Sequence, residues 1–122
     1  WRLVGVDQLH VNGLQNKFWE TDESVVASIQ ALQQPLLQQQ NVVPVVSSGQ
    51  WGGQAFETYQ RTKTVDLLYM AGGGIMAHPM GPAAGVAAIQ QAWKAAVDGL
   101  SFDEARVQYP EFNSAAQKFN SK

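Results

Sequence analysis

Three successive glycines, Gly72, Gly73 and Gly74, are the residues in this sequence best suited to hold an anion. A short apolar run that ends at Met70 precedes them, and a helical pattern opens after them at Pro82. Glycine has no Cβ and tolerates φ above zero, so the backbone N–H groups of such a stretch can curl around a phosphate. Strand, glycine loop and helix start together predict a phosphate cradle. The alternative is a tight strand-to-helix turn that binds nothing.

Four more residues with useful chemistry stand at or just after the ends of two earlier apolar runs. His10 and Lys17 follow the first run, and Ser48 and Gly49 follow the second. A lysine ammonium is a point charge that attracts phosphate, and hydroxyl and amide groups can donate hydrogen bonds to it. Three of them have a plainer alternative: Lys17 as a solvated loop residue, His10 as a hydrogen-bonded core histidine, and Ser48 as the cap of the following turn.

The rest of the chain predicts alternating strands and helices. Apolar and β-branched runs bounded by glycine, proline or polar residues predict strands at 6–11, 42–46 and 64–70. Capping residues, among them Thr21 and the capping box of Ser101 with Glu104, and apolar periodicity predict helices at 22–34, 54–61, 82–98, 102–108 and 110–119.

Two predictions concern the buried faces of these elements. The run 42–46 is apolar at every position, which predicts a strand buried on both sides. In the helix 82–98, a stripe at spacings of three and four predicts the buried face. That stripe consists of Val86, Ile89, Trp93 and Val97.

Strand and helix therefore alternate three times, which predicts an α/β fold with a parallel sheet. We divide the chain into the end of a preceding helix (1–5) and three βα units, at 6–37, 38–63 and 64–122, the last with extra C-terminal helices. Three strands cannot close a barrel and leave two bare edges. We therefore expect the rest of a barrel or another chain to cover these edges, and we expect a homodimer.

Composition narrows the class of partner. The chain has 122 residues, 45% hydrophobic and 15% charged, with a net charge of −2 and no cysteine. Scattered lysines and arginines give no basic stripe, so we expect neither nucleic acid nor membrane as a partner. The absence of cysteine excludes disulfides and thiolate metal sites. Without a signal peptide or a long apolar run, the default expectation is a cytoplasmic protein.

Three motifs in order resemble the RuBisCO large-chain superfamily. They are GVDQLHVNGLQNK (5–17), VVSSG (45–49) and GGGIMAHPMGPAAG (72–85), and together they extend the resemblance over nearly the whole chain. The resemblance implies that the chain is the C-terminal part of a (β/α)8 TIM barrel, with strands 6–8, where the chemistry sits on the loops after the strands.

Departures from the carboxylase pattern point to one branch of that superfamily. Carboxylating members have Leu-Glu after the lysine and Ser-Gly-Gly in the next loop, whereas here Phe18-Trp19 follow Lys17 and Gln50 follows Gly49. This is similar to the non-carboxylating, form IV RuBisCO-like proteins, which include enolases and isomerases of phosphorylated ketoses and enzymes of oxo-sugar-acid phosphates. A true ribulose-bisphosphate carboxylase and a non-catalytic binding or assembly domain are the alternatives.

The resemblance also implies roles for individual residues. The backbone at Gly72 and Gly73 is expected to bind one substrate phosphate, with the catalytic-site lysine Lys17 beside it. His10 and the Ser48-Gly49 loop are expected at the far end of the substrate.

The resemblance further implies that the full-length enzyme uses Mg²⁺. Its metal ligands and its proton-abstracting lysine are expected on strands that this chain does not contain. The 122 residues alone are therefore predicted to bind phosphate weakly, if at all, and to catalyse nothing. His78 is expected to brace the glycine loop, and Trp51 and Trp93 are expected to pack in the core or an interface.

Overall fold

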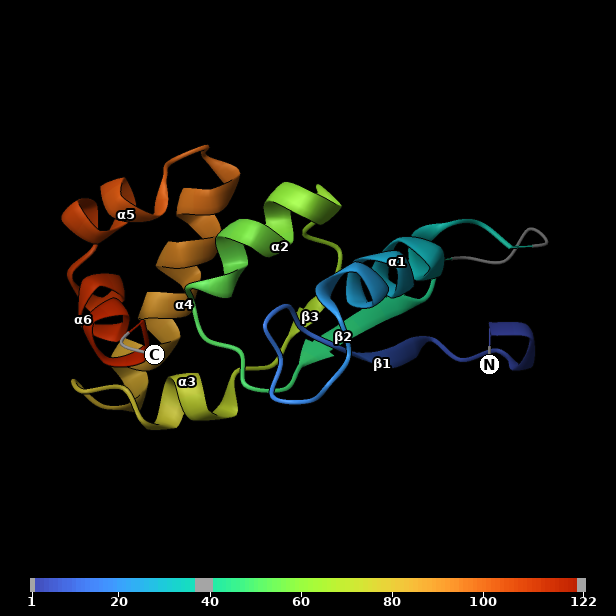
Figure 1. Ribbon diagram of the computed structural model, residues 1–122, viewed down its shortest axis with the longest axis horizontal. Coiled ribbons are helices and arrows are strands. Elements are labelled where there is room, and N and C mark those ends of the chain that lie inside the picture. Colours follow the sequence, from blue (N-terminus) through green and yellow to red (C-terminus); the bar gives the residue numbers. More distant parts are fainter. Residues whose placement is uncertain (1, 37–40, 121–122) are drawn as a thin grey trace.

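A computed structural model describes residues 2–36 and 41–120, and its centre is a three-stranded parallel sheet (Figure 1). The strands are β1 (Gln8–Asn12), β2 (Val43–Ser47) and β3 (Leu68–Tyr69), adjacent in chain order. Asn12 pairs with Ser47, and Val46 pairs with Tyr69. All three strands thus end at the same edge of the sheet, as the βα alternation predicted.

Helices connect and extend these strands in the predicted order. They are a 3-10 turn Arg2–Val4 and the α-helices α1 Asp22–Gln33, α2 Gln54–Thr62, α3 Gly72–Met76, α4 Pro82–Val97, α5 Phe102–Gln108 and α6 Pro110–Phe119. Thr21 caps α1 by accepting from the Ser24 amide, and Ser101 forms a capping box with Glu104, as predicted. Residues 1 and 38–40 lie outside the described residues. The predicted helix end (1–5) and the predicted βα unit 38–63 begin at these positions.

Two hydrophobic cores hold these elements together. The sheet core lies where α1 packs on β1 and β2. Its buried residues are Val11, Leu14, Val25, Val26, Ile29, Leu32, Val42 and Val46. The helical core lies among α2, α4, α5 and α6. Its buried residues are Ala55, Ala92, Ala95, Ala105 and Phe112, with Trp51, Phe56, Trp93, Leu100, Phe102 and Tyr109 packed against them.

The sheet has one covered face and one open face. Pro44 and Val46 in β2 are buried, whereas Val43 and Val45 are only half-buried. Leu68 in β3 is 43% exposed. The prediction that residues 42–46 are buried on both sides is therefore wrong for this part of the protein, because within the described residues helices cover only one face.

The buried face of α4 differs from the predicted stripe. Val86 and Val97 are 43% and 46% exposed. The fully buried positions of the helix are instead its small residues, Gly85, Ala88, Ala92, Ala95 and Ala96. The stripe prediction is wrong at Val86 and Val97 because it ranked residues by size, whereas Trp93 does pack against the helical core. Small side chains let neighbouring elements approach closely, and a Cβ on Gly85 would lie 2.4 Å from the Ile75 carbonyl oxygen.

Candidate functional site

An open groove of about 640 Å³ lies where the three strands end. We call it the strand-end groove. It brings together all six residues singled out from the sequence: His10, Lys17, Ser48, Gly49, Gly72 and Gly73. The remaining lining residues are Phe18, Ser47, Gln50, Trp51, Met70, Gly74, Ala77 and Phe119. The roles assigned to the six residues stay predictions, but their convergence follows from the parallel sheet.

The three glycines form a helical turn, so the predicted open loop is wrong. Gly72, Gly73 and Gly74 begin the five-residue helix α3, and none of them has a positive φ. A Cβ on Gly72 or Gly73 would meet nothing within 4 Å, whereas a Cβ on Gly74 would lie 2.8 Å from the Gln50 carbonyl oxygen. Gly74 is needed for close packing, while Gly72 and Gly73 present bare backbone to the groove. Amides in the first turn of a helix have no carbonyl partner within that helix.

The loop after β2 turns through two successive left-handed residues. Ser48 has φ 73° and Gly49 has φ 85°. A left-handed conformation costs a residue with a Cβ about 1 kcal/mol or more. The Ser48 hydroxyl donates to Asn12 Oδ1 at 2.7 Å, so it joins the ends of β1 and β2 instead of capping the next turn.

His10 lies at the exposed rim of the groove, so the alternative of a core histidine is wrong. Its Nε2 is hydrogen-bonded to the Ser47 hydroxyl, which lies 3.3 Å from the Ser48 hydroxyl. Asn12 donates in turn to the Glu20 carboxylate. A line of polar contacts therefore runs across the ends of β1 and β2 and orients the groups that face the groove.

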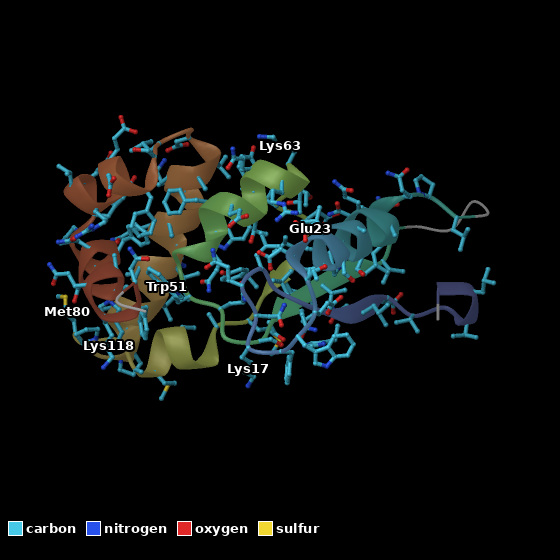
Figure 2. All side chains as sticks on the ribbon, in the orientation of Figure 1. Lys17, Glu23, Trp51, Lys63, Met80 and Lys118 are labelled. Carbon is cyan, nitrogen blue, oxygen red and sulfur yellow. The ribbon has the colours of Figure 1, made fainter. Side chains whose placement is uncertain are left out.

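Lys17 extends from the loop that follows β1, at the molecular surface (Figure 2). Asn16 shapes this loop: its Nδ2 donates to the Gly13 and Glu20 carbonyl oxygens, at 3.2 and 3.0 Å. A Cβ on Gly49 would lie 3.8 Å from the Lys17 Cβ, so the two loops adjoin. Within residues 2–36 and 41–120, no carboxylate forms an ion pair with Lys17. Its Nζ lies over the Phe18 ring, 5.6 Å from the ring centroid.

Sequence reasoning missed Ser47 and Phe119 as parts of the groove. The contact between Ser47 and His10 depends on the register of β1 against β2, which no local motif reveals. Phe119 comes from the last helix, and its ring centroid lies 5.5 Å from that of Trp51. Trp51 also stacks on Phe112, so its predicted packing role is confirmed although its side chain also lines the groove.

The packing prediction for Trp93 is also confirmed. The Trp93 ring packs edge-on against Tyr69, with centroids 5.3 Å apart. His78 is buried, and its Nε2 lies 3.0 Å from the Glu111 carbonyl oxygen while its Nδ1 accepts from the Met80 amide. His78 is thus buried as a structural residue that joins the turn after α3 to α6, and its predicted role in bracing the glycine residues themselves stays a prediction.

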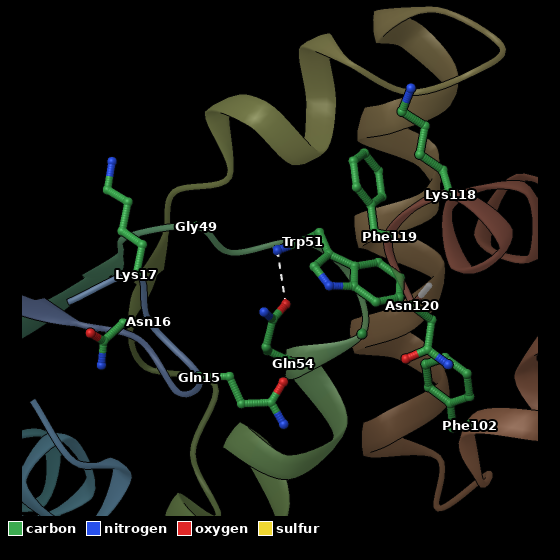
Figure 3. Close-up of a pocket in the computed structure, with 11 residues that line it drawn as sticks. Gln15, Asn16, Lys17, Gly49, Trp51, Gln54, Phe102, Lys118, Phe119 and Asn120 are labelled. Carbon is green, nitrogen blue, oxygen red and sulfur yellow. Dashed lines mark hydrogen bonds between the residues drawn. The ribbon is translucent and has the colours of Figure 1, made fainter. Parts of the chain in front are cut away.

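A second hollow of about 560 Å³ adjoins the groove (Figure 3). Figure 3 shows Lys17 and Gly49 on one side of it and Lys118 and Phe119 on the other, with Trp51 between them. It shares Lys17, Gly49, Trp51 and Phe119 with the strand-end groove. Its other lining residues are Gln15, Asn16, Gly53, Gln54, Phe102, Lys118 and Asn120.

Neither a metal cluster nor a membrane span appears in the part of the chain that the structure describes. Its His, Asp and Glu side chains do not gather in any group of three that could hold a metal ion. Carboxylate clusters are what Mg²⁺ prefers, so these residues do not fit a magnesium centre of their own. Over the same residues, every helix is too short or too polar to cross a bilayer.

A comparison with models of protein families identifies the family of this chain. Residues 1–119 match the model of the ribulose bisphosphate carboxylase large chain, catalytic domain. The chain belongs to the RuBisCO large-chain family. The resemblance drawn from the three sequence motifs is therefore confirmed.

The similar proteins include both RuBisCO-like proteins and ribulose bisphosphate carboxylases. The chain is 53% identical to a 3-oxo-isoapionate-4-phosphate decarboxylase of Rhizobium etli, over 98% of this chain and 29% of that protein. It is 49% identical to a 3-oxo-isoapionate-4-phosphate transcarboxylase/hydrolase of Xanthobacter autotrophicus, over 94% of this chain and 28% of that protein. The crystal structure of a rubisco-like protein from Burkholderia fungorum superposes with a TM-score of 0.92 and 42% identity, over 96% of this chain and 30% of that one.

These likenesses also confirm the fold class. The chain is an α/β unit of three parallel strands, from the C-terminal part of a barrel protein. It spans about 29% of the length of the Rhizobium relative.

Proposed function

We propose that this RuBisCO-like chain forms the phosphate-binding part of an enzyme that acts on a phosphorylated ketose or oxo-sugar acid. The observation that carries the proposal is the strand-end groove, in which residues from three separate sequence motifs line one opening. Identity of 53% to a decarboxylase of 3-oxo-isoapionate 4-phosphate supports the substrate class.

The groove suits a phosphate electrostatically. Among the described residues that line the groove none carries a carboxylate, and Lys17 supplies a positive charge. Bare backbone at Gly72 and Gly73 lets a phosphate approach the main chain, because no side chain stands in front of it. Charge-assisted hydrogen bonds from an ammonium and from amides are the strong contacts in phosphate sites. One phosphate would therefore lie between Lys17 and the start of α3.

The other end of the substrate would meet the polar line at the ends of β1 and β2. His10 Nε2 and the Ser47 hydroxyl already contact each other at the groove. Together with the Ser48-Gly49 turn they offer donors to a hydroxyl, a carboxylate or a second phosphate. A sugar acid that carries a phosphate at one end and a carboxylate at the other matches this distribution of groups.

The family resemblance implies Mg²⁺ for the whole enzyme, and such an ion, when bound, would supply Lewis-acid stabilisation of negative charge on a substrate oxygen. Its ligands and the proton-abstracting lysine are proposed to lie outside these 122 residues. Within this chain Lys17, His10 and the three loops bind and orient the substrate, and the chain alone is expected to be inactive.

The test is an assay of the full-length protein with 3-oxo-isoapionate 4-phosphate. We expect decarboxylation, and we expect Lys17→Met to lower kcat/KM by about 10- to 100-fold, the value of a lost charged hydrogen bond. Lys63→Met is the matched control, because Lys63 caps the C-terminus of α2 and does not line the groove. Carbon dioxide fixation with ribulose 1,5-bisphosphate would instead favour a carboxylase. Turnover of neither compound would favour a binding or assembly role.

A further inference from the structure

Gln50 is a polar side chain buried behind the strand-end groove. Only 1% of it is exposed, although it stands in the loop between β2 and α2. Glutamine is rarely buried unless its carboxamide is fully hydrogen-bonded. Burial removes the hydrogen bonds that water makes to its NH₂ group and its carbonyl oxygen, and only the protein can replace them. What it contacts therefore indicates why it is there.

The carboxamide of Gln50 joins the loops that follow β1 and β2 to β3. Its Nε2 donates to the Leu14 carbonyl oxygen at 3.0 Å and lies 3.4 Å from the Ser48 carbonyl oxygen. Its Oε1 lies 3.2 Å from the Tyr69 hydroxyl, which shares its single proton between this oxygen and the Trp51 carbonyl oxygen at 2.8 Å. Burial raises the pKa of the Tyr69 phenol, so this hydroxyl keeps its proton and remains a donor.

Gly13 provides the space that this contact needs. A Cβ on Gly13 would lie between 2.1 and 2.4 Å from the carboxamide atoms of Gln50. The φ of Gly13 is not positive, so its backbone conformation suits any residue and its lack of a side chain serves fit alone. Gly13 and Gln50 are thus a complementary pair: Gln50 supplies the carboxamide, and Gly13 leaves the space that the carboxamide occupies.

We propose that Gln50 is a positioning residue that holds the Lys17 loop (residues 13–17) against the loop after β2. Leu14, whose carbonyl receives the Gln50 hydrogen bond, stands three residues before Lys17. Fixing that carbonyl fixes the start of the loop, and so keeps Lys17 beside Gly49 and over the groove. The consequence for substrate rests on the proposed phosphate role of the groove, but the restraint on the loop does not.

The distinguishing experiment is hydrogen exchange on the full-length protein without substrate. Gln50→Gly should speed the exchange of backbone amides 14–18 by about tenfold, the effect of losing a buried hydrogen bond, while amides of α4 and α6 exchange as before. A uniform rise across all elements, or no change at 14–18, would overturn the proposal, because a side chain that only fills space has no selective effect on that loop.

A pair of substitutions tests the fit between positions 13 and 50. Gly13→Ala alone should disturb the Lys17 loop strongly, because the new methyl overlaps Gln50. Gly13→Ala combined with Gln50→Gly should behave like Gln50→Gly alone, because the overlapping carboxamide is then gone. If the double variant is as disturbed as the sum of both changes, the two residues are not a coupled pair and the proposal fails.

Gln33→Ala is the matched control for loss of a glutamine contact. Gln33 Nε2 donates to Thr64 Oγ1 at 2.9 Å and to the Asp66 carbonyl oxygen at 3.0 Å, before β3 begins. This change should lower stability without altering exchange at 14–18.

Binding of inorganic phosphate to the same full-length variants separates the two proposals. Gln50→Gly should weaken phosphate binding by about tenfold through the released Lys17 loop, and Gln33→Ala should not. If exchange at 14–18 rises but wild-type protein binds no phosphate, the positioning role stands and the phosphate role of the groove fails.

Discussion

The two walls of the strand-end groove are built in different ways. The loop wall, residues 13–17 and 47–50, is held by side-chain hydrogen bonds such as Ser48 to Asn12 and Gln50 to Leu14. The glycine wall, residues 72–74, is held by close backbone approach, with Gly74 directly against Gln50 and Trp51. The loop wall therefore depends on side-chain hydrogen bonds, for which Gly13 leaves space, whereas the glycine wall depends only on the absence of a side chain at Gly74.

This difference divides the three glycines into two classes. Gly74 is buried and has no room for a methyl group, so its role is packing. Gly72 and Gly73 have open space in front of them, so packing does not require glycine there. A ligand that approaches the backbone supplies a physical reason for glycine at these two positions.

The largest effect is expected from Gly74→Ala. Its methyl would lie 2.8 Å from the Gln50 carbonyl oxygen and from the Trp51 Cβ, so α3 must move. We expect a loss of about 2 kcal/mol in the free energy of unfolding, typical of overpacking. Chemical denaturation of the full-length protein measures it. A loss no greater than that of Gly73→Ala would break the division between the two classes.

Gly73→Ala should show the reverse behaviour. The new methyl meets nothing within 4 Å in the free protein and alanine favours a helix more than glycine does, so stability should not fall and should rise by up to about 1 kcal/mol. In the groove the methyl would stand between the backbone and a phosphate, and we expect affinity for inorganic phosphate to fall about tenfold. Calorimetric titration measures that affinity. An unchanged affinity for phosphate would mean that the glycine wall is not part of the phosphate site.

On the loop wall, Ser48 allows a comparison of two changes at one position. Ser48→Ala keeps the left-handed φ of 73° and loses the bond to Asn12, so it should cost about 1 kcal/mol of stability. Ser48→Gly loses the same bond but relieves the backbone, so the two effects should roughly cancel. Thermal denaturation of both variants tests this. Equal losses would mean that the left-handed backbone of Ser48 carries no strain.

The smallest effect is expected in α5, which lies outside both walls and packs in the helical core. It serves as a reference for changes in stability that do not involve the groove. The Ser101 backbone amide, and then its hydroxyl, hold the pKa of Glu104 below its ordinary value of 4.5. A lowered pKa means that this contribution to stability is present above pH 4.5 and is lost as the pH falls through the pKa of the folded state. Glu104→Gln should therefore flatten the acid side of the stability profile, measured by thermal denaturation, without altering phosphate binding. An unchanged acid slope would contradict this.

Much of the fold could be predicted because local signals agreed with the tertiary structure. Thr21, Ser101 and Pro82 begin helices where capping chemistry says they should. Convergence of the six site residues needed only one further inference: parallel strands end at a common edge, so the loops after them meet.

The failures share a cause, which is that close contacts between distant segments leave no local pattern. The buried face of α4 follows alanines and Gly85, because neighbouring elements come too near for larger residues. Because glycine disfavours helix, the sequence predicted a loop at Gly72 to Gly74. In the structure, packing of Gly74 against Trp51 stabilises a helical turn there. Gln50 stood out from the sequence only as a departure from the carboxylase motif, and its bond to Leu14 spans 36 residues.

The pairing of β1 with β2 makes the groove sensitive to deletions. His10 lies opposite Val45 and Asn12 lies opposite Ser47. In a strand, removal of a single residue exchanges the two faces of everything beyond it. A one-residue deletion inside β2 would turn Val46 out of the sheet core and move both serines away from their partners on β1. Natural variation in length should therefore be absent from this strand and confined to the connections before it.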